Sequence, residues 1–511
     1  MVVAVEKTVY RQRRQSLGTV QEYELLAIDY VQGQADMNFA FFFDAPQAGE
    51  PDHHPSTQCL HESLVRAMQA FPILTGHIER RKGIGMNGER WMVVVDPKRV
   101  NLPAFSHSHA DGAAYGRTRD ALFRWDRWAE ETHMAELHSL ATQPLLGLHV
   151  VRYACGALSI HTKMRHQVMD GCALFRFFFA WARLCTRMHR GGTGPAVPLP
   201  AAGTNAAADY PLCDRLICAS KISPPQGPSR PTATLHPCSS TATRVHRYMA
   251  KLDVFLRRLA RLRNTTHPAD DMPPLPAQMH RFTITLDAQR ALKERFGSLA
   301  SCSRGDAVLR KHRASYVTTN DLVVALFWRA VTRAHAQCNP SDPYTCMSVA
   351  CDLRARIGVP SAYSGNASYP LPIHLTKEAM FRHSVTDTAA FIRYHIDLLS
   401  SDLALHMGAL LASPKRMRRF AAMFHPCTSF FMASALVSVP MYQRLDFGTV
   451  PAHIDIPPYL APGFSIWLPS NPAKPILAPV PATVINIALR DDVFQLLVRD
   501  PEFNAYVSLV Y

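Results

Sequence analysis

Apolar residues recur at the spacing of an α-helix in several stretches of the chain. One stretch ends at Pro72, and its apolar side chains lie four, three, one and three positions apart, at Leu60, Leu64, Ala67, Met68 and Phe71. Apolar positions also mark one face of residues 172–189. Because side chains three and four positions apart share one face of a helix, both stretches predict amphipathic helices that bury that face.

Two further helices are predicted in the second half, together with the residues that begin them. Asp287 is the expected N-cap of a helix that ends at Gly297, because a short polar side chain can accept from free N–H groups of the first turn and glycine favours a helix stop. Asn320 is likewise expected to cap a helix whose residues 322–331 are almost wholly apolar. Such a helix must be buried on most sides.

Runs of alternating apolar residues predict strands between these helices. Residues 146–150 and 158–166 alternate and are joined by the turn sequence Ala-Cys-Gly-Ala at 154–157, which predicts a hairpin. A third alternating run, residues 281–286, predicts another strand. Strands and helices occur in both halves, so the predicted class is mixed α/β.

The stretch from about residue 191 to residue 243 breaks this pattern. It is rich in Pro, Gly, Ala, Ser and Thr and has no amphipathic period, which is typical of a linker or a long crossover. One core rarely organises as many as 511 residues. We therefore expect an N-terminal domain of residues 1–190, a crossover and linker of residues 191–278 and a C-terminal domain of residues 279–511.

Composition and charge narrow the class of protein. The chain is 48% hydrophobic and 19% charged, so it can bury large cores and is expected to fold. Its formal net charge of +15 raises the question of an anionic partner. The densest basic clusters, residues 11–14 and 416–419, are short and lack the interleaved aromatic residues of a nucleic-acid platform. We therefore expect no nucleic-acid partner.

The sequence carries no pattern typical of a metal site or a membrane protein. None of the 12 cysteines forms a CxxC pair, and His53, His54 and His161 have no partners at ligand spacing, so we expect free thiols and no metal. The longest apolar stretches are shorter than the roughly 18 residues that span a bilayer. The first fifteen residues lack the sustained apolar stretch of a secretory signal. These patterns predict a cytoplasmic protein without a transmembrane segment.

The strongest candidate for chemistry is a histidine at the end of a predicted strand. His166 shares a strand face with Leu158 and Ile160, so its side chain is expected to point toward the interior. A neutral imidazole can take a proton from a hydroxyl at cellular pH, which makes His166 a candidate general base. Asp170, four residues on and followed by Gly171, can orient this ring or hold the loop by pairing with an arginine.

This turn and several other segments resemble the BAHD acyltransferases and their fungal relatives, such as the trichothecene acetyltransferases. The turn looks like the family signature HxxxDG, and the other segments follow in the family's order at similar separations. The matching segments are residues 60–78, 165–171, 317–330, 352–366, 446–448 and 500–503. The resemblance implies a monomer of two chloramphenicol-acetyltransferase-like domains, each a mixed sheet flanked by helices, with a channel between the domains.

The resemblance also implies roles for the residues of the signature. His166 would be the catalytic base. Asp170 would point away from the substrate and pair with an arginine, and motif position favours Arg354 over the alternative, Arg356. Arg165 faces away from His166 by strand alternation, so we expect a charge at the surface or at an interface.

Other family positions carry weaker expectations. Asp446 and Gly448 match the first half of the motif DFGWG, which is structural in the family, but the Trp and the second Gly are absent here. Ser434 lies in the approximate counterpart of a segment near the acyl-transfer centre and is a candidate for stabilising the oxyanion. Lys311 and Arg313 are candidate contacts for CoA phosphates, although a solvated turn explains them as well.

The function implied by the resemblance is acyl transfer from a CoA thioester to a hydroxyl of a small secondary metabolite or a glycolipid. Acyl-CoA would be a co-substrate, no cofactor would be tightly bound, and the reaction would pass through a ternary complex. One alternative is a condensation-like or wax-ester-type acyltransferase that uses a carrier-bound donor or a lipid alcohol. Those groups often carry a second His where this chain has Arg165. Another alternative is a non-catalytic binding protein of the same fold, against which the intact signature argues.

Overall fold

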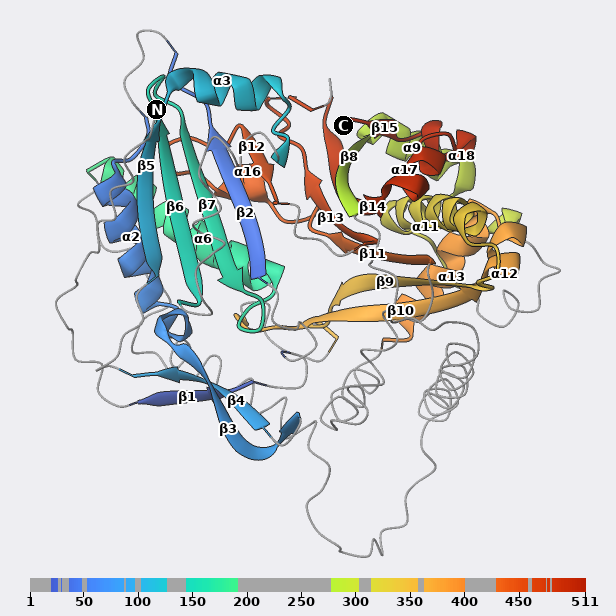
Figure 1. Cartoon of the computed structure of the whole chain (residues 1–511), viewed down its shortest axis with the longest axis horizontal. Helices are drawn as coiled ribbons and strands as arrows, with labels where there is room; N and C mark the ends of the chain where they lie inside the picture. Colours follow the sequence, from blue (N-terminus) through green and yellow to red (C-terminus); the bar gives the residue numbers. More distant parts are fainter. Residues whose placement is uncertain are drawn as a thin grey trace, which may run out of the picture.

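The structure is a computed structural model in which two bodies of sheet and helix lie next to each other (Figure 1). It describes residues 20–25, 29, 36–47, 53–86, 89–96, 103–125, 144–191, 277–302, 314–356, 363–399, 429–457, 462–474, 476–477 and 480–511. Most of the expected linker, residues 192–276, lies outside these residues. The proposed domain boundaries therefore stay a prediction.

A five-stranded sheet dominates the first body. Its strands, in spatial order, are β12 (His453–Asp455), β2 (Asp36–Phe43), β7 (Leu158–Arg165), β6 (Leu146–Tyr153) and β5 (Ala104–Ala110). β6 and β7 pair antiparallel and confirm the predicted hairpin, whereas β5 runs parallel to β6. The sheet is therefore mixed.

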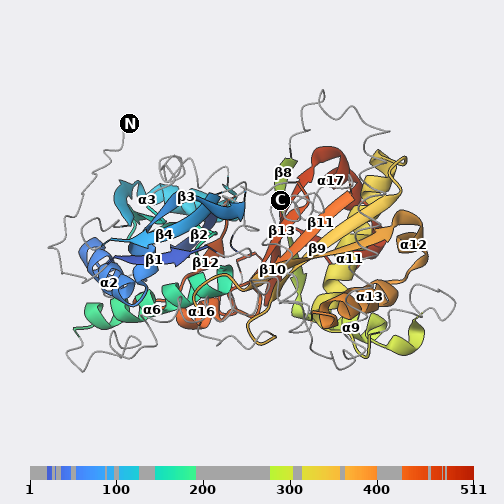
Figure 2. The same ribbon diagram turned by 90° about the horizontal axis from the view of Figure 1, so that it is seen from below.

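Two helices cover one face of this sheet. α2 (Thr57–Gln69) and α6 (Gly171–His189) pack against each other, and both confirm the helices predicted from apolar spacing (Figure 2). The indole Nε1 of Trp181 in α6 donates to the carbonyl of Leu60 at 3.1 Å and to Oγ of Ser63 at 3.0 Å. These bonds satisfy the one polar atom of a fully buried indole and fix the register of the two helices.

Smaller elements complete the first body. α3 (Gly112–Asp120) packs on the other face of the sheet, where Ala114 and Tyr115 share a cluster with Phe42. A separate antiparallel sheet contains β1 (Gln21–Glu24), β4 (Glu89–Val95) and β3 (His77–Met86), in that order. The 3-10 helix η1 (Pro72–Thr75) connects α2 to β3.

The second body is built on a mixed seven-stranded sheet. Its order is β10 (Ser368–Thr376), β9 (Tyr344–Asp352), β11 (Ser429–Ala435), β13 (Phe464–Pro469), β14 (Ala482–Arg490), β8 (Ala277–Thr285) and β15 (Ser508–Leu509). β11 runs parallel to β9 and β13, and the other pairs are antiparallel. β8 confirms the strand predicted at residues 281–286 as far as Thr285, and Leu286 is the first residue of α9.

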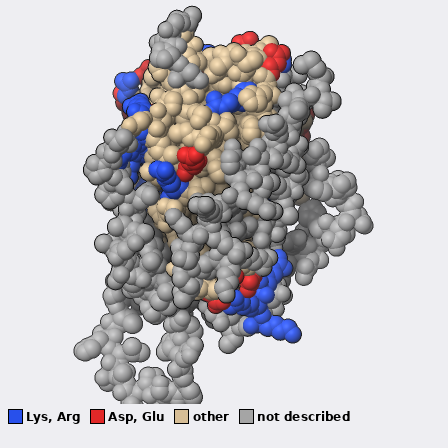
Figure 3. All heavy atoms as spheres, turned by 90° about the vertical axis from the view of Figure 1, so that its left-hand side faces the viewer, with Lys and Arg blue, Asp and Glu red and all other residues tan. Residues whose placement is uncertain are grey.

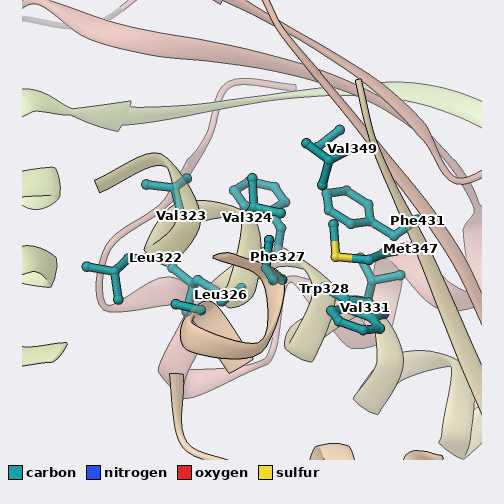
Figure 4. Packing of buried hydrophobic residues seen from close by; sticks show 14 of the residues in the cluster. Leu322, Val323, Val324, Leu326, Phe327, Trp328, Val331, Met347, Val349 and Phe431 are labelled. Atoms are coloured by element: carbon teal, nitrogen blue, oxygen red, sulfur yellow. The ribbon is translucent and has the colours of Figure 1, made fainter. Parts of the chain in front are cut away.

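α11 (Thr319–Cys338) is the central helix of the second core. Apolar side chains on nearly all its sides pack against β9, β11 and neighbouring helices (Figure 4). This arrangement confirms that the almost wholly apolar helix is buried. The remaining helices of the described residues are α9 (Leu286–Phe296), η2 (Leu299–Ser301), α12 (Lys377–Arg382), α13 (Val385–Asp397), α16 (Met441–Arg444), α17 (Asp491–Leu497) and α18 (Pro501–Asn504).

Both predicted helix caps in this half are wrong by two residues. α9 is capped by Thr285, whose side chain accepts from the N–H of Ala288. α11 is capped by Thr318, which forms a capping box with Asp321. In each case a threonine two positions earlier takes the extended conformation and the hydrogen bond of an N-cap, which leaves the predicted residue inside the first turn.

The two halves of the chain interlock. β12 comes from the second half but pairs with β2, with His453 opposite Phe42, and so adds an edge strand to the first sheet. α16 also packs against α6. Among the described residues, none of the helices is both long and apolar enough to cross a bilayer.

Candidate active site

His166 occupies the turn that connects β7 to α6. The turn is closed by a hydrogen bond from the N–H of Val168 to the carbonyl of Arg165 at 3.0 Å. Asp170 then caps α6, because its Oδ1 accepts from the N–H of Ala173 at 2.9 Å. The half-buried His166 is thus held between the end of a strand and a capped helix.

The carboxylate of Asp170 is fully engaged away from the histidine. Its oxygens accept from Nη2 of Arg354 at 2.9 Å and from the N–H of Ala367 at 2.8 Å, in addition to the helix cap. The same Nη2 donates to the carbonyl of Gly365 at 2.8 Å. Asp170 therefore joins the His166 turn to the loop that follows Tyr363.

The structure brings Asp170 together with Arg354 rather than with Arg356. Nη1 of Arg356 instead donates to the carbonyl of Leu399 at 2.9 Å. Burial disfavours the charge of Arg354, but Asp170 and Asp352 outweigh it and raise the pKa of the guanidinium above its usual value. Both side chains of the Asp170–Arg354 pair are at most 3% exposed, so the pair is a buried ion pair.

The environment of His166 favours a neutral imidazole. Burial lowers its pKa below the ordinary value of 6.5, and the charge of Asp170, the side chain of Asn366 and nearby backbone groups oppose this only in part. Within the described residues, the buried Nδ1 has no hydrogen-bond partner. A neutral ring at cellular pH can accept a proton.

Asn366 is a residue of the site to which sequence analysis assigned no role. Its Nδ2 donates to the carbonyl of His166 at 2.9 Å and to Oδ1 of Asp29 at 3.0 Å. Its Oδ1 is buried without a hydrogen-bond partner in the described part of the chain. The available signal was its position at the end of the segment Tyr-Ser-Gly-Asn, residues 363–366, in the family-like part of the sequence.

The end of β11 reaches the first turn of α6. A Cβ atom at Gly171 would lie 3.2 Å from Cδ2 of Leu436, so the two elements are in close contact here. Ser434 lies two residues earlier, partly buried and opposite Ile466 of β13. No hydrogen bond connects Ser434 to His166 among the described residues, and its role at the oxyanion stays a prediction.

The Asp446–Gly448 loop lies at the other end of α6. The N–H of Gly448 donates to Oγ1 of Thr186 and to Oδ1 of Asp446, both at 2.9 Å. Phe447 packs edge-on against Trp181, with ring centroids 4.7 Å apart. Thr186 is fifteen residues from Gly171, or about 22 Å along the helix at 1.5 Å per residue. The loop therefore supports α6 at a distance from His166.

Arg165 differs from the sequence prediction. Its side chain is buried rather than at the surface, and Nη1 lies 3.2 Å from Oδ1 of Asp36. The reason is the strand register, which places Asp36 of β2 directly opposite Arg165 of β7. Lys163 pairs with the same carboxylate at 3.3 Å.

Other expectations for this site are not tested by the described residues. Lys311 and Arg313 lie outside the described residues, so their expected contacts with CoA phosphates stay a prediction. Two cavities of about 650 and 660 Å³ lie along α6 and beside α11, and neither includes His166 in its lining. In the described part of the chain, no three His, Cys, Asp or Glu residues are arranged to hold a metal ion.

The sequence matches a known protein family. The profile of the Transferase family matches residues 130–452. Anthranilate N-benzoyltransferase protein 1 of Dianthus caryophyllus is 22% identical over 372 residues, which are 70% of this chain and 68% of that protein. O-acyltransferase pigD of Monascus ruber is 24% identical over 200 residues, which are 38% of this chain and 42% of that protein.

A solved structure shares the fold. The crystal structure of F. graminearum TRI101 complexed with coenzyme A and deoxynivalenol has a TM-score of 0.66 at 16% identity, over 96% of this chain and 100% of that chain. This likeness confirms the predicted fold class of two acyltransferase-like domains with mixed sheets. The family match covers more than half of the chain and includes both the His166 turn and the Asp446–Gly448 loop. The protein therefore belongs to the Transferase family of BAHD-type acyltransferases and is an acyltransferase enzyme.

Proposed function

We propose that the protein transfers an acyl group from acyl-CoA to a hydroxyl of a small molecule, with His166 as the general base. The observation that carries the proposal is the half-buried imidazole of His166, whose pKa is lowered by burial, on a turn fixed by the Asp170–Arg354 pair and by Asn366. The structural neighbour TRI101, which was crystallised with coenzyme A and deoxynivalenol, supports this pair of substrates.

The proposed reaction is a single displacement in a ternary complex. The neutral imidazole takes the proton of the acceptor hydroxyl while the hydroxyl oxygen attacks the thioester carbonyl. The new C–O bond forms, the C–S bond breaks, and the proton held by His166 passes to the departing thiolate of CoA. No acyl-enzyme is required, and His166 returns to its neutral form.

Other residues would position the base or stabilise charge. The Asp170–Arg354 pair would fix the turn, since its polar groups are already satisfied by each other and by backbone groups. Asn366 would hold the backbone of His166 through the hydrogen bond to its carbonyl. We assign Ser434 the stabilisation of the oxyanion formed at the thioester carbonyl. The acceptor would be a small secondary metabolite or a glycolipid.

Replacement of the base tests the proposal. His166→Ala should lower kcat by about 10² to 10⁴, the usual contribution of a general base. Turnover is measured by release of free CoA thiol from acetyl-CoA and longer acyl-CoA donors with a panel of alcohols. Circular dichroism and thermal melting should match the wild type, because a half-buried turn residue contributes little packing.

A matched histidine serves as the control. His109 is exposed on the edge strand β5, so His109→Ala should keep wild-type turnover. Near wild-type turnover of a folded His166→Ala variant would show that another group is the base.

A further inference from the structure

The outer side of α6 faces a cavity whose lining does not include His166. The cavity holds about 650 Å³ and lies between α6 and the segment that contains α16. The two helices lie next to each other at the lower edge of Figure 2. We call this cavity the arginine groove, after the side chains Arg176, Arg183, Arg187, Arg190 and Arg444 in its lining.

The charge of the arginine groove is unbalanced. Among the described residues, its lining holds these five guanidinium groups and one carboxylate, that of Asp446. The carboxylate of Asp446 forms an ion pair with Nη2 of Arg190 at 3.8 Å, and the lining still carries a net positive charge. On the end of the molecule that carries α2, the visible Lys and Arg side chains form several separate patches, some with Asp or Glu side chains beside them (Figure 3).

Repulsion between these arginines destabilises α6 when the groove holds no anion. Arg183, Arg187 and Arg190 follow one another at spacings of four and three, where like charges repel along a helix. The helix dipole favours cations only in the last turn, and Arg176 and Arg183 lie before it. An anion in the groove would remove this repulsion.

Two arginines are already arranged to donate. Nη1 of Arg176 is buried and has no hydrogen-bond partner within the described residues, a state that costs free energy unless an acceptor is supplied. The guanidinium of Arg444 lies over the ring of Phe179, 5.0 Å from its centroid. This contact uses the face of the guanidinium and leaves its in-plane N–H groups for another acceptor.

We propose that the arginine groove binds a ligand with clustered phosphate groups, of the size of a nucleotide. Guanidinium groups donate in pairs to phosphate oxygens, and the volume of the groove lies in the range of small-molecule sites. Two sources can supply this chemistry. One is the nucleotide end of CoA, which rests on the proposed function, and the other is a free phosphorylated metabolite, which does not.

Calorimetric titration of the full-length protein with pyrophosphate tests the groove without any turnover. The wild type should bind pyrophosphate, and Arg183→Gln and Arg444→Gln should each weaken binding by about tenfold or more, as expected for loss of a charge-assisted bond. Arg183→Glu should abolish binding. Arg290→Glu, an exposed position in α9 outside the groove, should bind like the wild type.

Melting curves show whether each variant is folded; Arg183 and Arg444 are exposed, so their variants should melt like the wild type. Failure of the folded wild type to bind pyrophosphate, or wild-type affinity for pyrophosphate in Arg183→Glu, would overturn the proposal.

Steady-state kinetics distinguish the two sources. Competitive inhibition of acyl-CoA by pyrophosphate, together with a raised KM for acyl-CoA in Arg183→Glu, would identify the ligand as the nucleotide end of CoA. Pyrophosphate binding with an unchanged KM would identify a free phosphorylated metabolite. A loss of turnover in His166→Ala concerns the proposed function alone, because binding to the groove is measured without catalysis.

Discussion

At the scale of single residues, His166 is subject to opposing influences on its charge. Burial lowers its pKa, and Asp170, Asn366 and the backbone raise it by less. Below this pKa the imidazole is protonated and cannot accept the proton of the acceptor. The fall of the rate at acid pH therefore depends on the groups that shift the pKa of His166.

We expect kcat/KM to fall on acidification with an apparent pKa below the ordinary histidine value of about 6.5. The rate should be level near neutral pH, where the ring is already neutral. Measurement of kcat/KM between about pH 4.5 and pH 8 checks this, with melting curves at each pH to exclude unfolding. An acid limb centred above pH 7 would contradict the dominance of burial.

Asp170→Asn should lower both stability and activity. The substitution leaves Arg354 buried without its main partner, and breaking a buried ion pair costs about 3–5 kcal/mol. Arg354 keeps a second partner in Asp170→Asn, because its Nη1 donates to Oδ1 of Asp352 at 3.1 Å. We therefore expect a loss of stability at the lower end of that range. Calorimetric unfolding measures the change.

The control for this variant is Asp352→Asn. The side chain of Asp352 is 46% exposed, so this variant should lose less than about 1 kcal/mol. Loss of activity in Asp170→Asn without loss of stability would instead indicate that Asp170 acts on the imidazole ring itself.

At the scale of elements, α6 is supported at both ends. Its first turn is capped by Asp170, and its last turns are bound by the Asp446–Gly448 loop through Thr186. Gly448 is the residue of this loop that admits no side chain. Its φ is 98°, and a Cβ atom would lie 2.1 Å from the carbonyl oxygen of His53.

Gly448→Ala should destabilise the protein by about 2 kcal/mol or more, because it combines backbone strain with a clash against a main-chain atom. kcat per folded molecule at saturating acyl-CoA should change little, since the loop is far from His166. Denaturant unfolding measures the loss of stability, and kcat corrected for the folded fraction measures the activity per folded molecule.

Gly116→Ala provides a matched control in α3. No atom lies within 4 Å of the Cβ position there, and alanine favours a helix over glycine. This variant should be neutral or slightly stabilising. Equal effects of the two alanine substitutions would show that the loop adapts to a side chain at Gly448.

At the scale of the whole molecule, one buried arginine joins the two large sheets. Arg281 of β8 donates to Asp455 of β12 at 2.5 Å and to Asn486 at 2.9 Å. Its Nη1 also donates to the carbonyl of Leu122 at 2.8 Å. Leu122 and Phe123 both have a positive φ, so this bond holds a strained turn after α3.

Arg281→Met should cost about 3–5 kcal/mol, because Asp455 stays buried without its countercharge. The double variant with Asp455→Leu should recover part of this loss, since an apolar pair leaves no charge uncompensated. Chemical denaturation of the single and double variants gives the coupling energy.

Arg290→Met is the control for an exposed pair. Arg290 and Asp287 are both more than half exposed, so the loss of their ion pair should have a small effect. Additive effects of Arg281→Met and Asp455→Leu would show that the two sheets are joined by other contacts.

The sequence by itself determined the elements that carry the site. Apolar periodicity records which face of an element is buried, and it was sufficient to predict α2, α6 and the β6–β7 hairpin that brings His166 to a strand end. The motif order was sufficient to predict the family and the fold class. Even locally, however, the caps Thr285 and Thr318 could not be chosen over polar neighbours two residues away.

Only the tertiary structure decided which polar groups meet. Asp170 and Arg354 are 184 positions apart in the sequence, and Asn366 and His166 are 200 apart. Strand order likewise placed Asp36 opposite Arg165 and added β12 to the first sheet. A periodic pattern shows that a face is buried but contains no information on its distant partner. The pairing of buried charges depends on how whole sheets and loops pack. An unpaired buried charge costs free energy, so packing arrangements that pair such charges are favoured.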